Sequence, residues 1–139
     1  MLTQDFYPKD FIFYFLFYVK INTKVQEMIN SYDFGGIVVD GKAYTNDVII
    51  FPDRVKDSWW RKEGHALHIE DIESVIVEKP EVLIVGTGKY GILNVLPETK
   101  EYNESKGMEL IVEPTDKACK MYNEVSKDKK AVAALHLTC

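Results

Sequence analysis

The chain has 139 residues, 46% of them hydrophobic and 28% charged, which fits one globular domain and excludes a disordered chain. Its formal net charge of -5 repels phosphate backbones, so we predict no nucleic-acid partner. The two cysteines, Cys119 and Cys139, are too few for a disulfide-stapled secreted scaffold, and a reducing cytoplasm is the expected location.

The first distinctive feature in chain order is an unbroken apolar run, FIFYFLFYV, over residues 11–19. It falls well short of the roughly 20 apolar residues that a membrane span needs, so we expect no transmembrane span. Its aromatic and β-branched residues favour a buried strand or a short packed segment, and a surface or membrane-associating segment is an alternative. A third interpretation starts from Met28, where the domain-like pattern begins. Residues 1–27 are then an N-terminal extension that is not integral to the fold, and residues 28–139 form a single α/β domain.

Antiparallel β structure is predicted next, over residues 32–51. Asp40 and Gly41 separate two β-favouring stretches, and Asp-Gly is a strong hairpin signal because both turn positions tolerate a positive φ. The apolar residues 48–51 form the following strand, which Pro52 stops.

Helices and strands alternate in the second half of the chain, after a loop over residues 52–68. Ile72, Val75 and Ile76 recur at helical spacing, and Pro80 ends that helix. The elements expected after it are a strand at 82–85, a turn at 86–88, a helix from Pro97 to Gly107, a strand at 108–112, a helix with Thr115 as its N-cap, and a strand at 131–137. The expected fold class is therefore α/β, with N-terminal antiparallel hairpin strands followed by αβαβαβ.

Several stretches between residues 32 and 139 together resemble a known family. They are the hairpin 36–44, Trp60 with Arg61, Gly64 with His65, residues 70–72, residues 83–88, Thr115 with Ala118, Tyr122 with Asn123, and residues 136–139. In these the chain resembles a family of small proteins of unknown function from archaea and bacteria. Its eukaryotic members include an adipogenesis-associated protein and a mitochondrial assembly factor for respiratory complex I. The resemblance implies a three-layer β/β/α fold and a role in protein assembly, and it supplies no reaction.

Residues 86–91, GTGKYG, match the G-x-G-x-x-G pattern directly after a strand, and Glu113 ends the next strand as a ribose-binding acid would. A dinucleotide site needs a helix that opens at the glycines, whereas the next helix here starts only at Pro97. We therefore predict a tight turn that brings the backbone close to a neighbour, and no cofactor. The alternative is that this loop holds a small anion through its N–H groups and its lysine. The candidate residues are Gly86, Thr87, Gly88 and Lys89.

Two further pairings suggest ligand or nucleophile chemistry. His65 and His68 form H-x-x-H, but a metal site needs three or four converging ligands, so we predict no metal. His136 and Cys139 have odd spacing on a predicted strand, which directs their side chains to opposite faces and disfavours a Cys–His nucleophile pair. We expect Cys119 and Cys139 to be small buried thiols, and we predict no catalytic residue.

The aromatic and basic loop over residues 52–68 contains the best candidates for a recognition surface. Trp59, Trp60 and Arg61 are of the types enriched at interface hot spots, and His65 follows them. The alternative is that one tryptophan packs in the core and the other covers the hairpin.

Two functions follow from these residues. The favoured one is a non-enzymatic protein-binding or assembly module in the cytoplasm, with a protein as partner, because no convincing catalytic constellation is present. The alternative is a small-molecule or anion-binding protein, or a small enzyme, whose site lies where the loop 86–91 meets Arg61 and His65.

Overall fold

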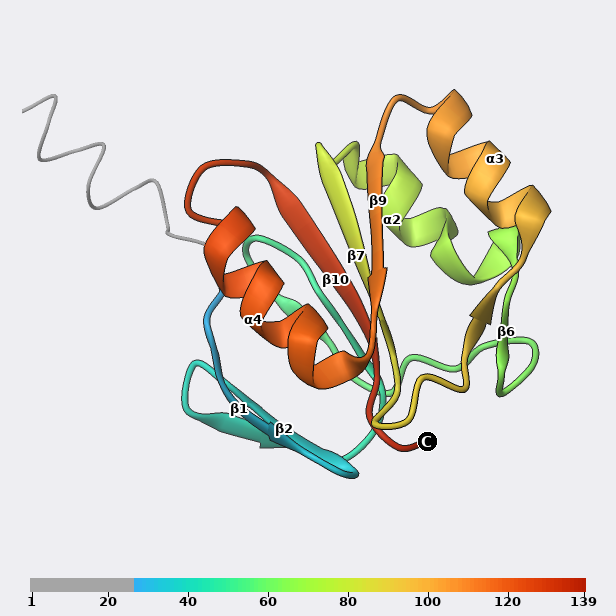
Figure 1. The fold of residues 1–139 in the computed structure, drawn as a ribbon. Coiled ribbons are helices and arrows are strands. Elements are labelled where there is room, and N and C mark those ends of the chain that lie inside the picture. Colours follow the sequence, from blue (N-terminus) through green and yellow to red (C-terminus); the bar gives the residue numbers. More distant parts are fainter. Residues whose placement is uncertain (1–26) are drawn as a thin grey trace, which may run out of the picture.

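The computed structural model describes residues 27–139 (Figure 1). The prediction of a strand or packed segment over residues 11–19 lies outside the described residues. So does the predicted extension over residues 1–27, except for Glu27. The single-domain prediction for residues 28–139 stays a prediction.

A five-stranded mixed sheet forms the middle of the molecule. Its bounds are β4 (Val48–Ile50), β5 (Val55–Lys56), β7 (Val82–Thr87), β9 (Glu109–Glu113) and β10 (Ala131–His136). The strand order is β5–β4–β10–β7–β9, with β7 parallel to β9 and β10, and β4 antiparallel to β5 and β10. Every residue of β7 and β10 is buried, as expected for continuously apolar strands that are covered on both faces.

One face of this sheet is covered by helix α4 (Thr115–Val125) and by a second, antiparallel sheet. That sheet contains β1 (Ile29–Asp33), β2 (Gly36–Val39) and β3 (Lys42–Tyr44). The predicted hairpin turn is confirmed, since Asp40 and Gly41 between β2 and β3 have φ angles of 47° and 80°. The core on this side includes Ile37, Val39, Ile84, Tyr122 and Leu135.

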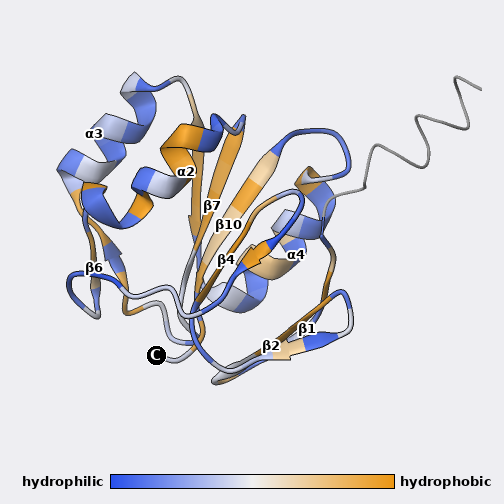
Figure 2. Ribbon diagram, turned by 180° about the vertical axis from the view of Figure 1, so that it is seen from behind, coloured by the Kyte–Doolittle hydropathy of each residue, from blue (hydrophilic) through white to orange (hydrophobic). Residues whose placement is uncertain are grey.

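The opposite face is covered by a 3₁₀ helix, η1 (Ile69–Ile72), by helices α2 (Glu73–Glu78) and α3 (Pro97–Ser105), and by the short parallel pair β6 (Ala66–Leu67) and β8 (Asn94–Val95). The core on this side includes Phe51, Trp59, Leu67, Leu83 and Val85. Figure 2 shows hydrophobic residues concentrated in β7 and β10, with α3 largely hydrophilic. The arrangement is the expected three-layer α/β fold.

Three local expectations need correction. Pro114, not Thr115, is the N-cap of α4, because the buried Thr115 hydroxyl instead donates to the His136 carbonyl at 2.6 Å. Gly86 and Thr87 continue β7, so the predicted turn begins only at Gly88. Cys119 is buried as expected, whereas Cys139 is partly exposed because it lies beyond the end of β10.

Candidate functional site

The carboxyl ends of three parallel strands define one edge of the central sheet, and the candidate site lies there. β7, β9 and β10 end at Thr87, Glu113 and His136 respectively. β4 runs in the opposite direction, so Asp47, which precedes it, lies at the same edge. Residues from four separate stretches of the chain are thereby brought together, as is common for ligand sites in open α/β sheets.

A largely buried network joins Asp47, Arg61 and His136. Arg61 Nη1 donates to Asp47 Oδ2 at 2.7 Å, and Arg61 Nη2 donates to the Gly64 carbonyl at 3.0 Å. His136 Nδ1 lies 2.8 Å from the same Asp47 Oδ2. The backbone N–H of Leu137 donates to Asp47 Oδ1 at 2.7 Å, so both carboxylate oxygens are held.

The hydrogen-bond geometry assigns the tautomer of His136. An ionised carboxylate only accepts, so the Nδ1 atom beside Asp47 carries the proton and donates it. The 3.1 Å approach of Arg61 Nη2 to this nitrogen is then a contact between two donors. His136 Nε2 and Arg61 Nε are buried and have no hydrogen-bond partner among the described residues.

Asp47 is ionised over the ordinary pH range. Its burial raises the pKa of the carboxyl, but the hydrogen bonds from His136, Leu137 and Arg61 outweigh burial and hold that pKa below its usual value. The negative charge faces the guanidinium of Arg61, and this pairing lowers the cost of burying both groups.

The loop after β7 is fastened to the segment after β10 by backbone hydrogen bonds. Lys89 N–H donates to the Thr138 carbonyl at 2.6 Å, and Ile92 N–H donates to the Cys139 carbonyl at 3.1 Å. Gly88 N–H donates to the Thr115 hydroxyl at 2.8 Å. These N–H groups are therefore engaged within the chain.

Gly88 is the point of closest backbone approach. Its φ is +102°, and a Cβ atom here would lie 2.4 Å from the carbonyl carbon of Cys139 and 2.9 Å from His136 Cδ2. Only glycine fits this conformation and this space. The close crossing of backbones agrees with the turn predicted for this loop.

The structure separates the two tryptophans of the predicted recognition loop. Trp59 is only 2% exposed, its indole donates to the Asp71 carbonyl at 3.0 Å, and Arg61 stacks over its ring at 4.7 Å. Trp60 is 76% exposed. Arg61 belongs to the buried network, whereas Trp60 presents a large hydrophobic side chain to solvent.

The other candidate residues lie at the same edge of the sheet, but their side chains do not all point toward one common site. His65 is exposed, and its ring lies edge-on to that of His136 at 5.8 Å. The Thr87 hydroxyl donates to the Glu113 carbonyl at 3.1 Å. Lys89 extends toward the hairpin sheet, where its Nζ lies 3.5 Å from Asp33 Oδ1.

The two histidines of the H-x-x-H pattern have different partners. His68 Nε2 pairs with Glu63, whereas His65 contacts His136. Within residues 27–139, no group of three or more His, Cys, Asp or Glu side chains is arranged to hold a metal ion.

Sequence reasoning did not select Asp47 or His136 for this site. Asp47 directly precedes the apolar strand β4, and His136 is the last residue of the apolar strand β10. A polar residue at a strand terminus is common and does not identify a site by itself. Asp47 and His136 meet because β4 pairs antiparallel with β10, and this pairing is not evident from the local sequence.

A comparison with known protein families shows to which family the chain belongs. Residues 29–136 match the family described as "Protein of unknown function (DUF498/DUF598)". The chain belongs to this family. The DUF498 description specifies no ligand, reaction or partner, and no helix of residues 27–139 is long and apolar enough to span a bilayer.

Solved structures show the same fold. This DUF498 chain is 35% identical to the conserved hypothetical protein PH1505 from Pyrococcus horikoshii OT3, with a TM-score of 0.70 over 80% of this chain and 98% of that one. An outer membrane protein from Bartonella henselae is 22% identical, with a TM-score of 0.71 over 85% and 100% of the two chains. A Mth938-like domain protein from Bordetella pertussis is 19% identical, with a TM-score of 0.59 over 83% and 87%. At these sequence identities, the last two similarities show only that the fold is shared.

Proposed function

We propose that this chain is a non-enzymatic protein-binding or assembly module of a reducing cytoplasm, and that its partner binds at the carboxyl edge of the central sheet. The observation that supports this most strongly is the exposure of large aromatic side chains at that edge. Trp60 is 76% exposed, Tyr90 72% and Phe34 52%. Exposed large apolar side chains are typical of interfaces, and Trp and Tyr are enriched at interface hot spots.

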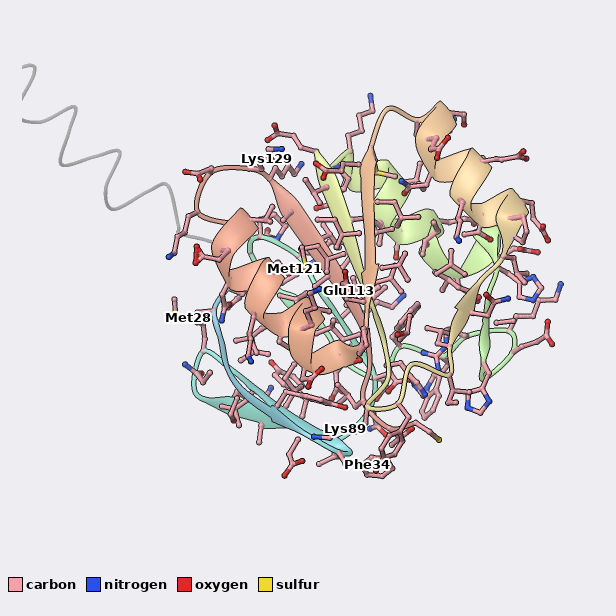
Figure 3. The ribbon with its side chains drawn as sticks, in the orientation of Figure 1. Met28, Phe34, Lys89, Glu113, Met121 and Lys129 are labelled. Atoms are coloured by element: carbon pink, nitrogen blue, oxygen red, sulfur yellow. The ribbon has the colours of Figure 1, made fainter. Side chains whose placement is uncertain are left out.

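Phe34 and Tyr90 form one continuous apolar feature although they come from distant parts of the chain. Their ring centroids are 6.3 Å apart. Figure 3 places Phe34 beside Lys89, the residue before Tyr90, at the lower edge of the molecule. Ile92, which is also exposed, extends this feature along the same loop.

The backbone that presents these side chains is preorganised. Trp60 precedes Arg61, whose guanidinium is fixed by Asp47. The loop that contains Tyr90 is fastened to the segment after β10 by the N–H groups of Lys89 and Ile92. A rigid surface loses less conformational entropy on binding, which favours affinity.

The test is to replace the exposed aromatics and follow a complex that purifies with the tagged full chain from its own cells. We expect the double variant Trp60→Ala/Tyr90→Ala to lose the partner, measured as the stoichiometry of the complex by native mass spectrometry. Val77→Ala is the matched control, because Val77 is equally exposed at 76% but lies on α2. Equal retention of the partner by both variants would contradict the proposal.

A second candidate function is the binding of a small anion, and one observation favours it. His136 Nε2 and Arg61 Nε are buried without hydrogen-bond partners among residues 27–139, and the His136 ring lies next to Gly88. Against it, the N–H groups of Gly88 and Lys89 are engaged within the chain, and the Lys89 side chain is paired with Asp33.

Isothermal titration separates the two candidates. The anion hypothesis predicts saturable binding of phosphate, a nucleotide or a small carboxylate, and weaker binding by Lys89→Ala. The protein-binding proposal predicts no heat from any of these ligands. Saturable binding together with an unchanged complex in Trp60→Ala/Tyr90→Ala would move the assignment to the anion site.

A further inference from the structure

A cavity of about 200 Å³ lies between β1 and α4, which run side by side on one face of the central sheet (Figure 1). Residues 29–32 of β1 line one wall, and Asp116, Cys119, Lys120 and Asn123 of α4 line the other. The helical residues are spaced at i, i+3, i+4 and i+7, so they belong to a single stripe of α4.

Hydrogen bonds hold the strand wall of this cavity in place at both ends. At the start of β1, the Asn123 side chain accepts from Ile29 N–H at 3.0 Å and donates to the Ile29 carbonyl at 2.8 Å. Near the end of β1, the Tyr32 hydroxyl donates to the Leu137 carbonyl at 2.9 Å. The cavity is therefore preformed, and a ligand that enters it has little conformational entropy to remove from the protein.

The inner part of the cavity is apolar and uncharged. Ile29 is only 5% exposed and Cys119 only 6%. Burial raises the pKa of the Cys119 thiol to about 12, so this thiol is protonated and neutral at ordinary pH. An apolar cavity of about 150 Å³ can hold a benzene molecule, so this one has room for one aromatic ring or branched alkyl group.

The rim of the cavity carries one charge of each sign. Asp116 and Lys120 are both exposed, and neither forms an ion pair with another of residues 27–139. The only hydrogen bond of the Asp116 carboxylate within this range is with the neighbouring Lys117 N–H, at 2.8 Å. Four helical residues rise about 6 Å along the axis, which leaves room for ligand groups between the two charges.

We propose that this cavity binds a small zwitterion with an apolar side chain, of the class of the free amino acids phenylalanine and leucine. The apolar side chain fills the cavity, the ammonium group pairs with Asp116, and the carboxylate pairs with Lys120. A zwitterion fits better than a simple anion or cation, because the rim offers one charge of each sign. The inference goes beyond the proposed function, because Trp60 and Tyr90 do not line this cavity.

A titration of the full chain with L-phenylalanine, followed by NMR, tests the proposal. We expect saturable shifts of the backbone amides of β1 and α4. The probe 3-phenylpropionate lacks the ammonium group and phenethylamine lacks the carboxylate, so each should bind about fivefold more weakly than L-phenylalanine. Glycine, which has no side chain to fill the cavity, should give no saturable shift.

Variants of the rim locate the carboxylate of the ligand. Lys120→Ala should bind L-phenylalanine about fivefold more weakly, yet bind phenethylamine as the natural chain does. Lys117→Ala is the matched control, because Lys117 lies on the same helix but does not line the cavity. It should bind both probes as the natural chain does.

Ser31→Trp tests the cavity itself. Ser31 is an exposed residue of the strand wall, so the fold tolerates a larger side chain there, and the indole should occupy the cavity and abolish binding. The proposal is overturned if L-phenylalanine gives no saturable shift in β1 and α4. It is equally overturned if the three aromatic probes bind alike, if Lys120→Ala behaves as Lys117→Ala does, or if Ser31→Trp binds as the natural chain does.

Discussion

At the scale of single residues, Asp47 joins several stretches of the chain that meet at the candidate site. Its two oxygens accept from the side chains of Arg61 and His136 and from the N–H of Leu137. Its own backbone carbonyl accepts from Trp59 N–H at 2.7 Å. Asp47 thereby fixes the loop over residues 52–68 onto the end of β10.

Removal of this carboxylate should strongly destabilise the fold. Asp47→Ala leaves the Arg61 guanidinium buried without its counter-ion, and we expect a loss of about 3 to 5 kcal/mol in the free energy of unfolding. Urea denaturation measures it. Asp53→Ala, which breaks an exposed ion pair with Arg54, should cost at most about 1 kcal/mol. Equal losses in the two variants would show that the buried network has no special role.

The same network predicts a dependence of stability on acidity. The pKa of Asp47 is lower in the folded than in the unfolded chain, so the stability that it contributes is fully present above the ordinary value of 3.8. That stability is lost as the pH falls through the lowered pKa. The difference in unfolding free energy between the natural chain and Asp47→Asn should therefore shrink below about pH 4. A difference independent of pH would contradict the assignment.

At the scale of elements, the loop after β7 and the segment after β10 hold each other. The crossing depends on Gly88, where the backbone has a positive φ and lies against Cys139 and His136. Residues with side chains are excluded here both by conformation and by space.

Gly88→Ala should therefore lower the free energy of unfolding by at least about 2 kcal/mol, from strain and overpacking combined. Thermal and urea denaturation measure the loss. Gly64→Ala is the control, because nothing lies within 4 Å of a Cβ atom at that position. A Gly88→Ala protein as stable as Gly64→Ala would mean that the loop relaxes freely away from β10.

At the scale of the whole molecule, two hydrogen bonds to one carbonyl oxygen tie the hairpin sheet to the segment after β10. The Tyr32 hydroxyl donates to the Leu137 carbonyl at 2.9 Å, and Gly35 N–H donates to the same oxygen at 2.8 Å. On the other side of β1, Asn123 joins the hairpin sheet to α4. Together with the shared apolar core, these bonds fix the first layer on the second.

Tyr32 makes this attachment sensitive to alkaline pH. Burial, with nearby Cys119 and acidic groups, raises the pKa of Tyr32 to about 12. Because the pKa is raised on folding, the Tyr32 hydroxyl contributes fully to the free energy of unfolding below about pH 10. This contribution is lost as the pH rises through 12.

Tyr32→Phe should therefore cost about 1 kcal/mol at neutral pH, and this difference from the natural chain should fade between pH 10 and 12. The free energy of unfolding is measured across this range for both proteins. Tyr90→Phe, at an exposed ring, should have no comparable effect. Persistence of the Tyr32→Phe difference at pH 12 would contradict the role given to the hydroxyl.

Most secondary-structure elements of residues 27–139 could be predicted from local pattern. Asp40-Gly41 predicted the hairpin, the apolar run of β7 predicted a doubly covered strand, and Pro97 predicted the start of α3. Each of these signals is contained within a few residues, because backbone conformation and side-chain periodicity are local properties. The N-cap of α4 was missed because the Thr115 hydroxyl bonds to a residue 21 positions away.

The sequence by itself determined the fold class, the order of most elements and the loop in which Trp59, Trp60 and Arg61 lie. Only the tertiary structure decided that Trp59 is core, that Trp60 is exposed, and that Arg61 meets Asp47 and His136. The reason is physical. Periodicity reports which face of an element is apolar, whereas the meeting of residues 47, 61 and 136 depends on strand order and direction, which are set by contacts across the whole sheet.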